Sequence, residues 1–219
     1  MSTSRPDGRV ERGRRTRQTI LARAMDIASS EGLEALSVRR LAAELDVSKS
    51  GVFAQFGSKE ELQLATVRAA VDVFVVEVVR PAMRTPGGLR RVWALYESWE
   101  RYARRPVFTG GCFFIAAAAE FDARPGRVRD AVAGAQRDWQ RLFARCLREA
   151  AELGDVARDA DVDQVAFELY ALARAGAQDA LLHDEPAAYD HARAAVLARL
   201  RAVALVPVEL PDTPVTRVR

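Results

Sequence analysis

Residues 37–62 read SVRRLAAELDVSKSGVFAQFGSKEEL, which is the pattern of two short helices joined by a tight turn. Ser37 belongs to the residue types that cap helix N-termini, so a helix of about two turns is predicted directly after it. Asp46 breaks the apolar pattern, and Ser48 can cap a second short helix that runs through Gln55. The apolar positions, spaced three or four residues apart within each helix, are Val38, Leu41, Ala42 and Leu45, then Val52, Phe53 and Phe56. Two helices joined so tightly must cross, which predicts a helix-turn-helix.

The second helix opens on residues that are small or cationic, namely Ser48, Lys49, Ser50 and Gly51. The recognition helix of a helix-turn-helix enters the major groove of DNA with its N-terminal residues against base edges and phosphates. Small side chains let the backbone approach a phosphate, which the positive end of the helix dipole also favours. Lys49 and Lys59 are the chain's two lysines and they bracket this helix. Unless they fall close together by chance, this placement favours compact phosphate contacts.

The segment resembles the DNA-binding signature of the TetR family of transcriptional regulators, in which an aromatic pair, a short turn and a Ser-Lys-Glu-Glu helix start follow the helix-turn-helix. The match covers about the first quarter of the chain, and the residues that carry it are Ser48, Lys49, Phe53, Phe56, Gly57, Ser58, Lys59, Glu60 and Leu62. The family usually has Gly where this chain has Asp46, a residue type that tolerates a left-handed turn. It commonly has Tyr where this chain has Phe53, so one expected phosphate hydrogen bond is missing.

The resemblance implies a homodimer that binds double-stranded DNA at a palindromic operator, as a repressor that an unidentified small-molecule effector releases. One short helix reads few base pairs, and a dimer that binds two half-sites about one turn of DNA apart would multiply the specificity. We expect no cofactor. Base or phosphate contacts are expected from Ser37, Arg39, Ser48, Lys49, Ser50, Gly51, Phe53, Gln55 and Lys59.

Charge is unevenly distributed along the 219 residues, although the net charge is only +3. Residues 1–17 hold six arginines against Asp7 and Glu11, and basic N-terminal arms commonly follow the DNA backbone. A solvated, disordered tail is an equal alternative for residues 1–9. The expected division is a flexible basic arm at 1–13, a helix-turn-helix domain at 14–57, a helical ligand-binding and dimerisation domain at 58–205, and a tail at 206–219.

Helical patterns on both sides of the helix-turn-helix predict an all-α fold. A first helix is expected to begin near Arg14 and to stop at Gly32, behind the recognition helix. An S-x-x-E capping box at Ser58 starts a long helix through about Val79. Its second half, VDVFVVEVV, has strand propensity, but the capped start and Pro81 just beyond its end favour one helix that links the DNA-binding part to the body.

Aromatic residues recur at helical spacing through the body. They have two interpretations, because such residues form ordinary core and also line small-molecule cavities between helices. The resemblance favours a cavity for the group without choosing its members. The candidates are Phe74, Trp93, Tyr96, Trp99, Phe113, Phe114, Trp139, Phe143 and Tyr170.

The last two predicted helices, at about 162–182 and 186–204, offer small and apolar faces wide enough for both a core and a partner. Proteins of the resembled family dimerise through these two helices as a four-helix bundle. The candidate interface residues are Phe167, Leu172, Gly176, Ala194 and Leu197. The alternative is that these faces only complete the core of the monomer.

Other classes of function have weaker support in the sequence. No apolar run reaches membrane-spanning length, which favours a cytoplasmic protein. Cys112 and Cys146 are expected to be reduced, buried thiols. A hydrolase with Cys112 as nucleophile and His183 as base remains an alternative, as does a protein-interaction adaptor with a vestigial helix-turn-helix, which Phe53 in place of Tyr favours. A metal at the two histidines is less expected than a solvated helix junction, and no reaction is assigned.

Overall fold

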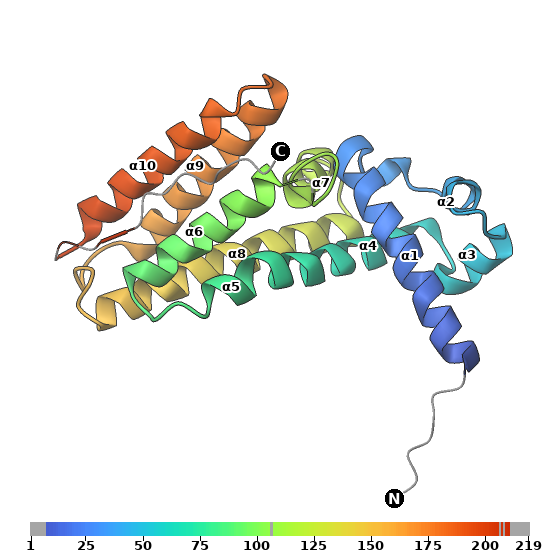
Figure 1. Ribbon diagram of the computed structural model, residues 1–219, viewed down its shortest axis with the longest axis horizontal. Helices are drawn as coiled ribbons and strands as arrows, with labels where there is room; N and C mark the ends of the chain where they lie inside the picture. Colours follow the sequence, from blue (N-terminus) through green and yellow to red (C-terminus); the bar gives the residue numbers. More distant parts are fainter. Residues whose placement is uncertain (1–7, 106, 206, 208, 211–219) are drawn as a thin grey trace, which may run out of the picture. The chain divides into compact units, whose positions relative to one another are not determined.

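The computed structural model describes residues 8–105, 107–205, 207, 209 and 210, and it is all-α as predicted (Figure 1). The remaining residues of the predicted arm and tail lie outside that description. The elements are α1 (Gly8–Glu31), the 3-10 turn η1 (Leu33–Ala35), α2 (Val38–Glu44), α3 (Lys49–Phe56), α4 (Lys59–Phe74), the π-helical turn η2 (Val75–Val79), α5 (Arg80–Ala82), α6 (Leu89–Arg104), α7 (Phe113–Phe121), α8 (Arg127–Glu152), α9 (Val162–Leu182) and α10 (Ala187–Val203). Val156 and Ala204 form an isolated antiparallel bridge.

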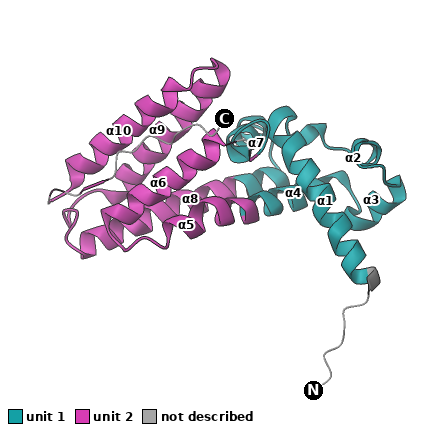
Figure 2. Cartoon of the chain, viewed as in Figure 1, with its two compact units in different colours: residues 1–71, 108–132 teal, residues 72–107, 133–219 magenta. Residues whose placement is uncertain are grey.

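The chain divides into two compact units (Figure 2). Unit 1 comprises residues 1–71 and 108–132, and unit 2 comprises residues 72–107 and 133–219. This division differs from the expected boundary after residue 57, because the segment that contains α7 packs against α1. Unit 1 therefore joins the helix-turn-helix to a segment that is remote from it in sequence.

Helix α1 begins at Gly8, so the expectation of a start near Arg14 was wrong, and residues 8–13 of the predicted flexible arm are helical. Glu11 explains the earlier start. Its carboxylate accepts hydrogen bonds from Arg14 at 2.9 Å and from Arg15 at 3.3 Å, pairs three and four residues apart that stabilise a helix. The arginines that suggested a loose arm thus support a helical turn.

Side chains of α1 and α7 hold unit 1 together. The Asp26 carboxylate accepts hydrogen bonds from the hydroxyl of Thr109 at 2.6 Å and from its backbone N–H at 2.9 Å. These bonds hold the pKa of Asp26 below its ordinary value. From α7, the Glu120 carboxylate accepts the backbone N–H groups of Leu33 and Glu34 at 2.6 and 2.9 Å. The free donors of η1, at the entrance to the helix-turn-helix, are thereby satisfied.

Gly110 marks the closest approach of this contact, and its replacement by alanine is expected to lower the free energy of unfolding by about 1–3 kcal/mol. An added Cβ would lie 2.0 Å from the backbone oxygen of Ser29, so backbone must shift. Thermal unfolding followed by circular dichroism measures the change. Gly134→Ala is the matched control, because its Cβ meets nothing within 4 Å and alanine is the better helix former. Equal melting temperatures for the two variants would contradict the close contact.

The predicted long helix after Ser58 is helical rather than a strand, as expected, but its end differs from the prediction. It passes through the π-helical turn Val75–Val79, and Pro81 lies inside the final turn instead of beyond it. In a regular α-helix the proline ring would clash with the carbonyl four residues earlier. The wider π turn displaces that carbonyl, which lets the helix continue to Ala82.

Unit 2 packs α6 against η2, α9 and α10, and α9 against α10. Its core contains a charge cluster, because Glu100 is fully buried and the side chain of Arg193 is 4% exposed. Arg193 donates to Glu100 and to Glu97, each at 2.7 Å, and its guanidinium lies 4.6 Å from the centre of the Trp93 ring. Arg104 pairs with Glu100 at 2.8 Å and also with Asp190. These ion pairs join α6 to α10.

Candidate nucleic-acid interface

Two serine caps start the helices of the helix-turn-helix, as predicted. The hydroxyl of Ser37 accepts the N–H of Arg40 at 3.1 Å, and that of Ser48 accepts the N–H of Gly51 at 3.0 Å. Asp46 adopts the left-handed conformation expected of it, with φ of 52°. The N–H of Val47 then donates to the carbonyl of Ala42 at 3.0 Å and closes the turn.

Helix α3 has one buried side and one exposed side. Val52 is fully buried and Phe56 is 7% exposed, so both anchor the helix as predicted. Phe53 was expected on the same apolar side, but it is 55% exposed and points away from the core. Ser48, Lys49 and Ser50 are also exposed. The exposed side of α3 therefore offers an ammonium group, two hydroxyls and an aromatic ring.

Arg17 of α1 braces the far end of α3, an interaction that sequence analysis missed. Its guanidinium donates to the backbone carbonyl of Gln55 at 2.5 Å and lies 4.4 Å from the centre of the Phe56 ring. A cation at the C-terminal end of a helix satisfies a carbonyl there and interacts favourably with the helix dipole. The only sequence signal for it was an arginine near the N-terminus. Arg17 therefore fixes α3 relative to α1.

The basic residues of the expected interface differ in their partners. Arg39 and Lys49 are exposed and have no ion pair or hydrogen-bond partner within the part of the chain that the structure describes. The ammonium of Lys59 instead donates to the Glu34 backbone carbonyl at 2.7 Å and to its carboxylate at 2.9 Å, and this bond lowers the pKa of Glu34. Lys49 and Arg39 thus carry uncompensated charge, whereas Lys59 ties α4 to η1.

The expected DNA-contacting residues all lie in unit 1. Arg39, Ser48, Lys49, Ser50, Phe53 and Lys59 are exposed, and Ser37, Gly51 and Gln55 are half-buried. A capped, braced recognition helix with its N-terminal residues exposed has the geometry to enter a major groove.

Comparisons with known proteins agree with this geometry. Residues 20–66 match the family described as bacterial regulatory proteins, tetR family, and residues 88–196 match the family described as tetracyclin repressor-like, C-terminal domain. Together these matches cover more than half of the chain. The chain belongs to the TetR family of transcriptional regulators. It is accordingly a DNA-binding regulator of transcription.

Individual relatives of this TetR-family regulator are distant. It is 32% identical over 87 residues to the HTH-type transcriptional regulator TcmR of Streptomyces glaucescens, a match that covers 38% of each chain. A TetR transcriptional regulator from Chloroflexus aurantiacus is similar in fold, with a TM-score of 0.82, 20% identity, and coverage of 89% of this chain and 98% of that one. A TetR-family regulator from Cytophaga hutchinsonii has a TM-score of 0.80 at 17% identity, covering 94% of this chain and all of that one.

Replacing Ser48 by alanine in the TetR-family regulator is expected to cost about 1 kcal/mol, the typical value of an N-cap. The N–H of Gly51 would lose its acceptor at the exposed N-terminal end of α3. Amide hydrogen exchange at Gly51 measures the loss of protection directly. Ser50→Ala is the control, because the Ser50 hydroxyl lies 3.2 Å from that of Ser48 but accepts no backbone N–H of the helix, so this variant keeps the Ser48 cap. Equal exchange rates in both variants would contradict the capping role of Ser48.

The aromatic candidates of the TetR-family regulator fall into separate groups. In unit 2, Phe74 packs edge-on against Trp139 at 4.9 Å between ring centres, and Trp139 packs against Phe143 at 4.8 Å. Along α6, Trp93 stacks on Tyr96 at 5.3 Å, with Trp99 beyond. Tyr170 lies under Arg174, whereas Phe113 and Phe114 contact each other in unit 1. A ligand site among these residues stays a prediction.

Tyr96 is a buried aromatic residue that carries a polar group. The residue is 1% exposed, and its hydroxyl has no hydrogen-bond partner within the described residues. Burial raises the pKa of this phenol well above its ordinary value. Tyr96 therefore stays protonated at neutral pH, with an unused donor inside unit 2.

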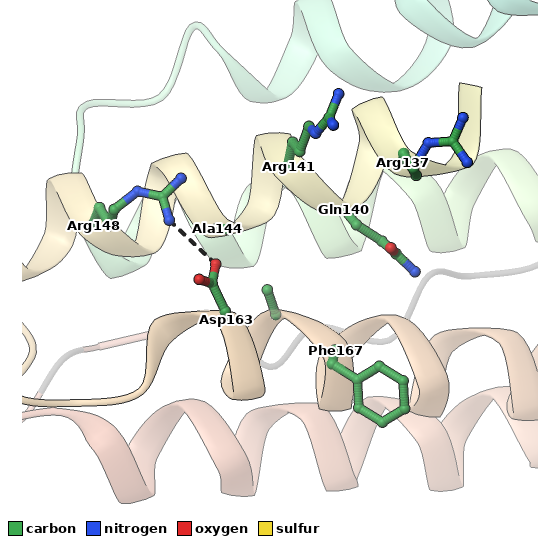
Figure 3. A pocket seen from close by; sticks show the side chains of 8 residues that line it. Arg137, Gln140, Arg141, Ala144, Arg148, Asp163 and Phe167 are labelled. Atoms are coloured by element: carbon green, nitrogen blue, oxygen red, sulfur yellow. Dashed lines mark hydrogen bonds and ion pairs between the residues drawn. The ribbon is translucent and has the colours of Figure 1, made fainter. Parts of the chain in front are cut away.

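A pocket of about 240 Å³ lies between α8 and α9 of the TetR-family regulator (Figure 3). It does not involve the aromatic candidates, and sequence analysis missed it because its residues come from two helices whose pairing was unknown. Its lining is Arg137, Gln140, Arg141, Ala144, Arg148, Asp163, Ala166 and Phe167.

The candidate dimer residues separate into an exposed and a buried group. Phe167 is 60% exposed and Ala194 is exposed, while Leu172 is half-buried. Gly176 and Leu197 are buried inside the protomer, so their assignment to a partner surface was wrong. A Cβ on Gly176 would lie 2.4 Å from that of Ala192, which shows that the glycine permits the close packing of α9 on α10.

The hydrolase and metal alternatives involve the two cysteines, the histidines and the carboxylates. Cys112 and Cys146 are buried and form no disulfide, as predicted. Cys112 lies in unit 1 and His183 in unit 2. Within the described ranges no group of three or more His, Cys, Asp or Glu side chains could hold a metal ion. Nor does any helix among them have the length and apolarity to cross a membrane.

Proposed function

We propose that this TetR-family regulator is a homodimeric repressor that binds a palindromic operator in the cytoplasm and is released by a small molecule. The observation that carries the proposal is the exposed start of α3, where Lys49 has no ion pair or hydrogen bond to any other residue that the structure describes and lies beside two serine hydroxyls. An unpaired ammonium at a helix N-terminus is suited to a DNA phosphate, whose binding also releases condensed counterions.

The dimer is proposed to form through α9 and α10. Both helices expose residues that a monomer would leave in water, including Phe167 on α9 and Ala194 on α10. Because α3 spans only Lys49–Phe56, one copy reads few base pairs, and two half-sites about one turn of DNA apart supply the missing specificity.

Release is proposed to follow from a shift between two conformations of the dimer. The effector would bind among the aromatic residues of unit 2, for which the buried hydroxyl of Tyr96 is a candidate donor. Helix α4 and its π-helical continuation run from the helix-turn-helix toward these residues along the chain, and are proposed to change the separation of the two recognition helices. Operator and effector must then weaken each other's binding by the same factor.

Footprinting of the purified protein on DNA from around its own gene tests this function. We expect two protected half-sites, related by two-fold symmetry, with centres about 34–36 Å apart or at a multiple of that spacing. One unpaired protected segment would contradict the dimer. An effector that binds without changing operator affinity would contradict the release mechanism while leaving DNA binding intact.

A protein-interaction adaptor is the second candidate, and the exposed Phe53 favours it. An aromatic ring that is 55% exposed and carries no hydroxyl can contact a protein as readily as DNA. The adaptor predicts no protected DNA at any salt concentration. Phe53→Tyr separates the two functions, because the added hydroxyl should tighten operator binding by the regulator and should weaken an apolar protein contact.

A further inference from the structure

The lining of the pocket between α8 and α9 combines apolar residues with an excess of positive charge (Figure 3). Ala144 and Ala166 of this lining are buried, and Phe167 is exposed. Asp163 supplies the carboxylate among the lining residues, and it is paired with Arg148 at 3.2 Å. Two arginines remain for an external partner.

Those two arginines have little internal compensation. Arg141 reaches Asp138 at 3.4 Å, but both side chains are about two-thirds exposed or more, so the pair is weak. Arg137 is exposed and has no ion pair or hydrogen bond within the residues that the structure describes. The pocket therefore suits an occupant that has an apolar group next to carboxylates.

The opposite end of α9 presents that chemistry. Leu181 is 52% exposed and Leu182 is 72% exposed, so the helix end presents two adjacent apolar side chains to water. Asp184 and Glu185 follow them in the exposed turn between α9 and α10. Leu181 and Leu182 follow Phe167 by 14 and 15 residues, which is about four helical turns. They therefore lie on the same side of α9 as Phe167, at a distance of roughly 22 Å along the helix axis.

We propose that the pocket between α8 and α9 receives the α9–α10 turn of a second copy of this chain. The proposal rests on the homodimer of the preceding section and fixes its register. In a two-fold interface, if residue i of one copy contacts residue j of the other, then j of the first contacts i of the second. Two α9 helices that cross antiparallel near Ala175, an exposed small residue about midway between Phe167 and Leu182, satisfy this condition.

The antiparallel crossing places complementary groups together at both ends of the interface. Leu182 of the second copy packs on Phe167, which removes two exposed apolar side chains from water. Asp184 and Glu185 of the second copy reach the guanidinium groups of Arg137 and Arg141. The same contacts repeat with the copies exchanged, so each substitution acts twice in the dimer.

Charge reversal tests the proposal by sedimentation equilibrium. We expect R137E/R141E and D184R/E185R each to raise the dimer dissociation constant about tenfold or more, because like charges then face each other. The fourfold variant R137E/R141E/D184R/E185R restores opposite charges and is expected to recover most of the loss. The matched control is R84E/R90E, whose exposed arginines lie outside the pocket lining, and it should dimerise as the wild type does.

The outcomes separate this proposal from the proposed function. If the wild type is a dimer and both reversals leave its dissociation constant unchanged, the pocket does not receive the turn, although the homodimer stands. If the fourfold variant is no tighter than the double variants, the two charge sets do not face each other. If the wild type stays monomeric at every concentration and on DNA, the homodimer itself fails. A small anion is the rival occupant of the pocket, and benzoate is its probe. If benzoate binds to the wild type and to R137E/R141E with equal affinity and does not change the dimer dissociation constant, the two arginines do not hold a small anion, and this rival is excluded.

Discussion

Replacing Arg193 by methionine is expected to lower the free energy of unfolding by about 3–5 kcal/mol, the range for breaking a buried ion pair by removing one partner. The side chain of Arg193 is 4% exposed and that of Glu100 is fully buried. Methionine fills similar volume but leaves Glu100 and Glu97 without the guanidinium that each contacts at 2.7 Å. Arg104 offsets only part of this loss, because it also serves Asp190.

Urea denaturation followed by tryptophan fluorescence measures the effect, since Trp93, Trp99 and Trp139 all lie in unit 2. The control is Arg199→Met, which removes an ion pair to Glu168 whose side chains are about one-third exposed, and about 0–1 kcal/mol is expected there. Adding Glu100→Gln to Arg193→Met should recover stability by removing the unpaired charge. Equal destabilisation by the two arginine variants would show that the buried cluster is not as strongly coupled as its geometry indicates.

Replacing Lys49 by alanine is expected to weaken operator binding by about 10- to 100-fold. The slope of the logarithm of the binding constant against the logarithm of the salt concentration is expected to become shallower by about one for each copy of the chain. Lys49 lies at the exposed start of α3 and has no partner in the described structure, so its charge is available to DNA. If Lys49 contacts a phosphate as proposed, removing it deletes that contact without disturbing a bond within the described residues. Titration of labelled operator at four or more salt concentrations gives both quantities.

Lys59→Ala is the contrasting variant. Its ammonium is already engaged by the carbonyl and carboxylate of Glu34, so a smaller change in the salt slope is expected. If the slope falls equally in both variants, Lys59 leaves Glu34 to reach DNA, as the family resemblance implied. If Lys49→Ala binds as the wild type does, Lys49 is not a contact residue.

Local features of this chain were predictable from the sequence. The helix-turn-helix, its serine caps and the left-handed Asp46 depend on residues within a few positions of one another, and each was confirmed. The helical identity of VDVFVVEVV was also predictable, because a capping box outweighs strand propensity. The predicted start of α1 was wrong, because the arginines were interpreted as a flexible arm. In the structure, Glu11 pairs with two of them, Arg14 and Arg15, within the helix.

Long-range features were not predictable, because periodicity identifies an apolar face but not its partner. Three hydrogen bonds illustrate this, because they join residues that are 38, 87 and 93 positions apart. They are the bonds from Arg17 to the Gln55 carbonyl, from the Leu33 N–H to the Glu120 carboxylate, and from Arg193 to Glu100. The same reason explains Gly176 and Leu197, whose small and apolar character fits both a core and a partner surface.

The most direct measurement is fluorescence anisotropy of the purified protein with DNA fragments from around its own gene, across a salt series and against random DNA. A specific regulator predicts saturable binding to one fragment that is at least about a thousandfold tighter than to random DNA, with the difference retained as salt increases. Weak binding to every fragment alike, vanishing together with rising salt, would contradict sequence-specific recognition by α3.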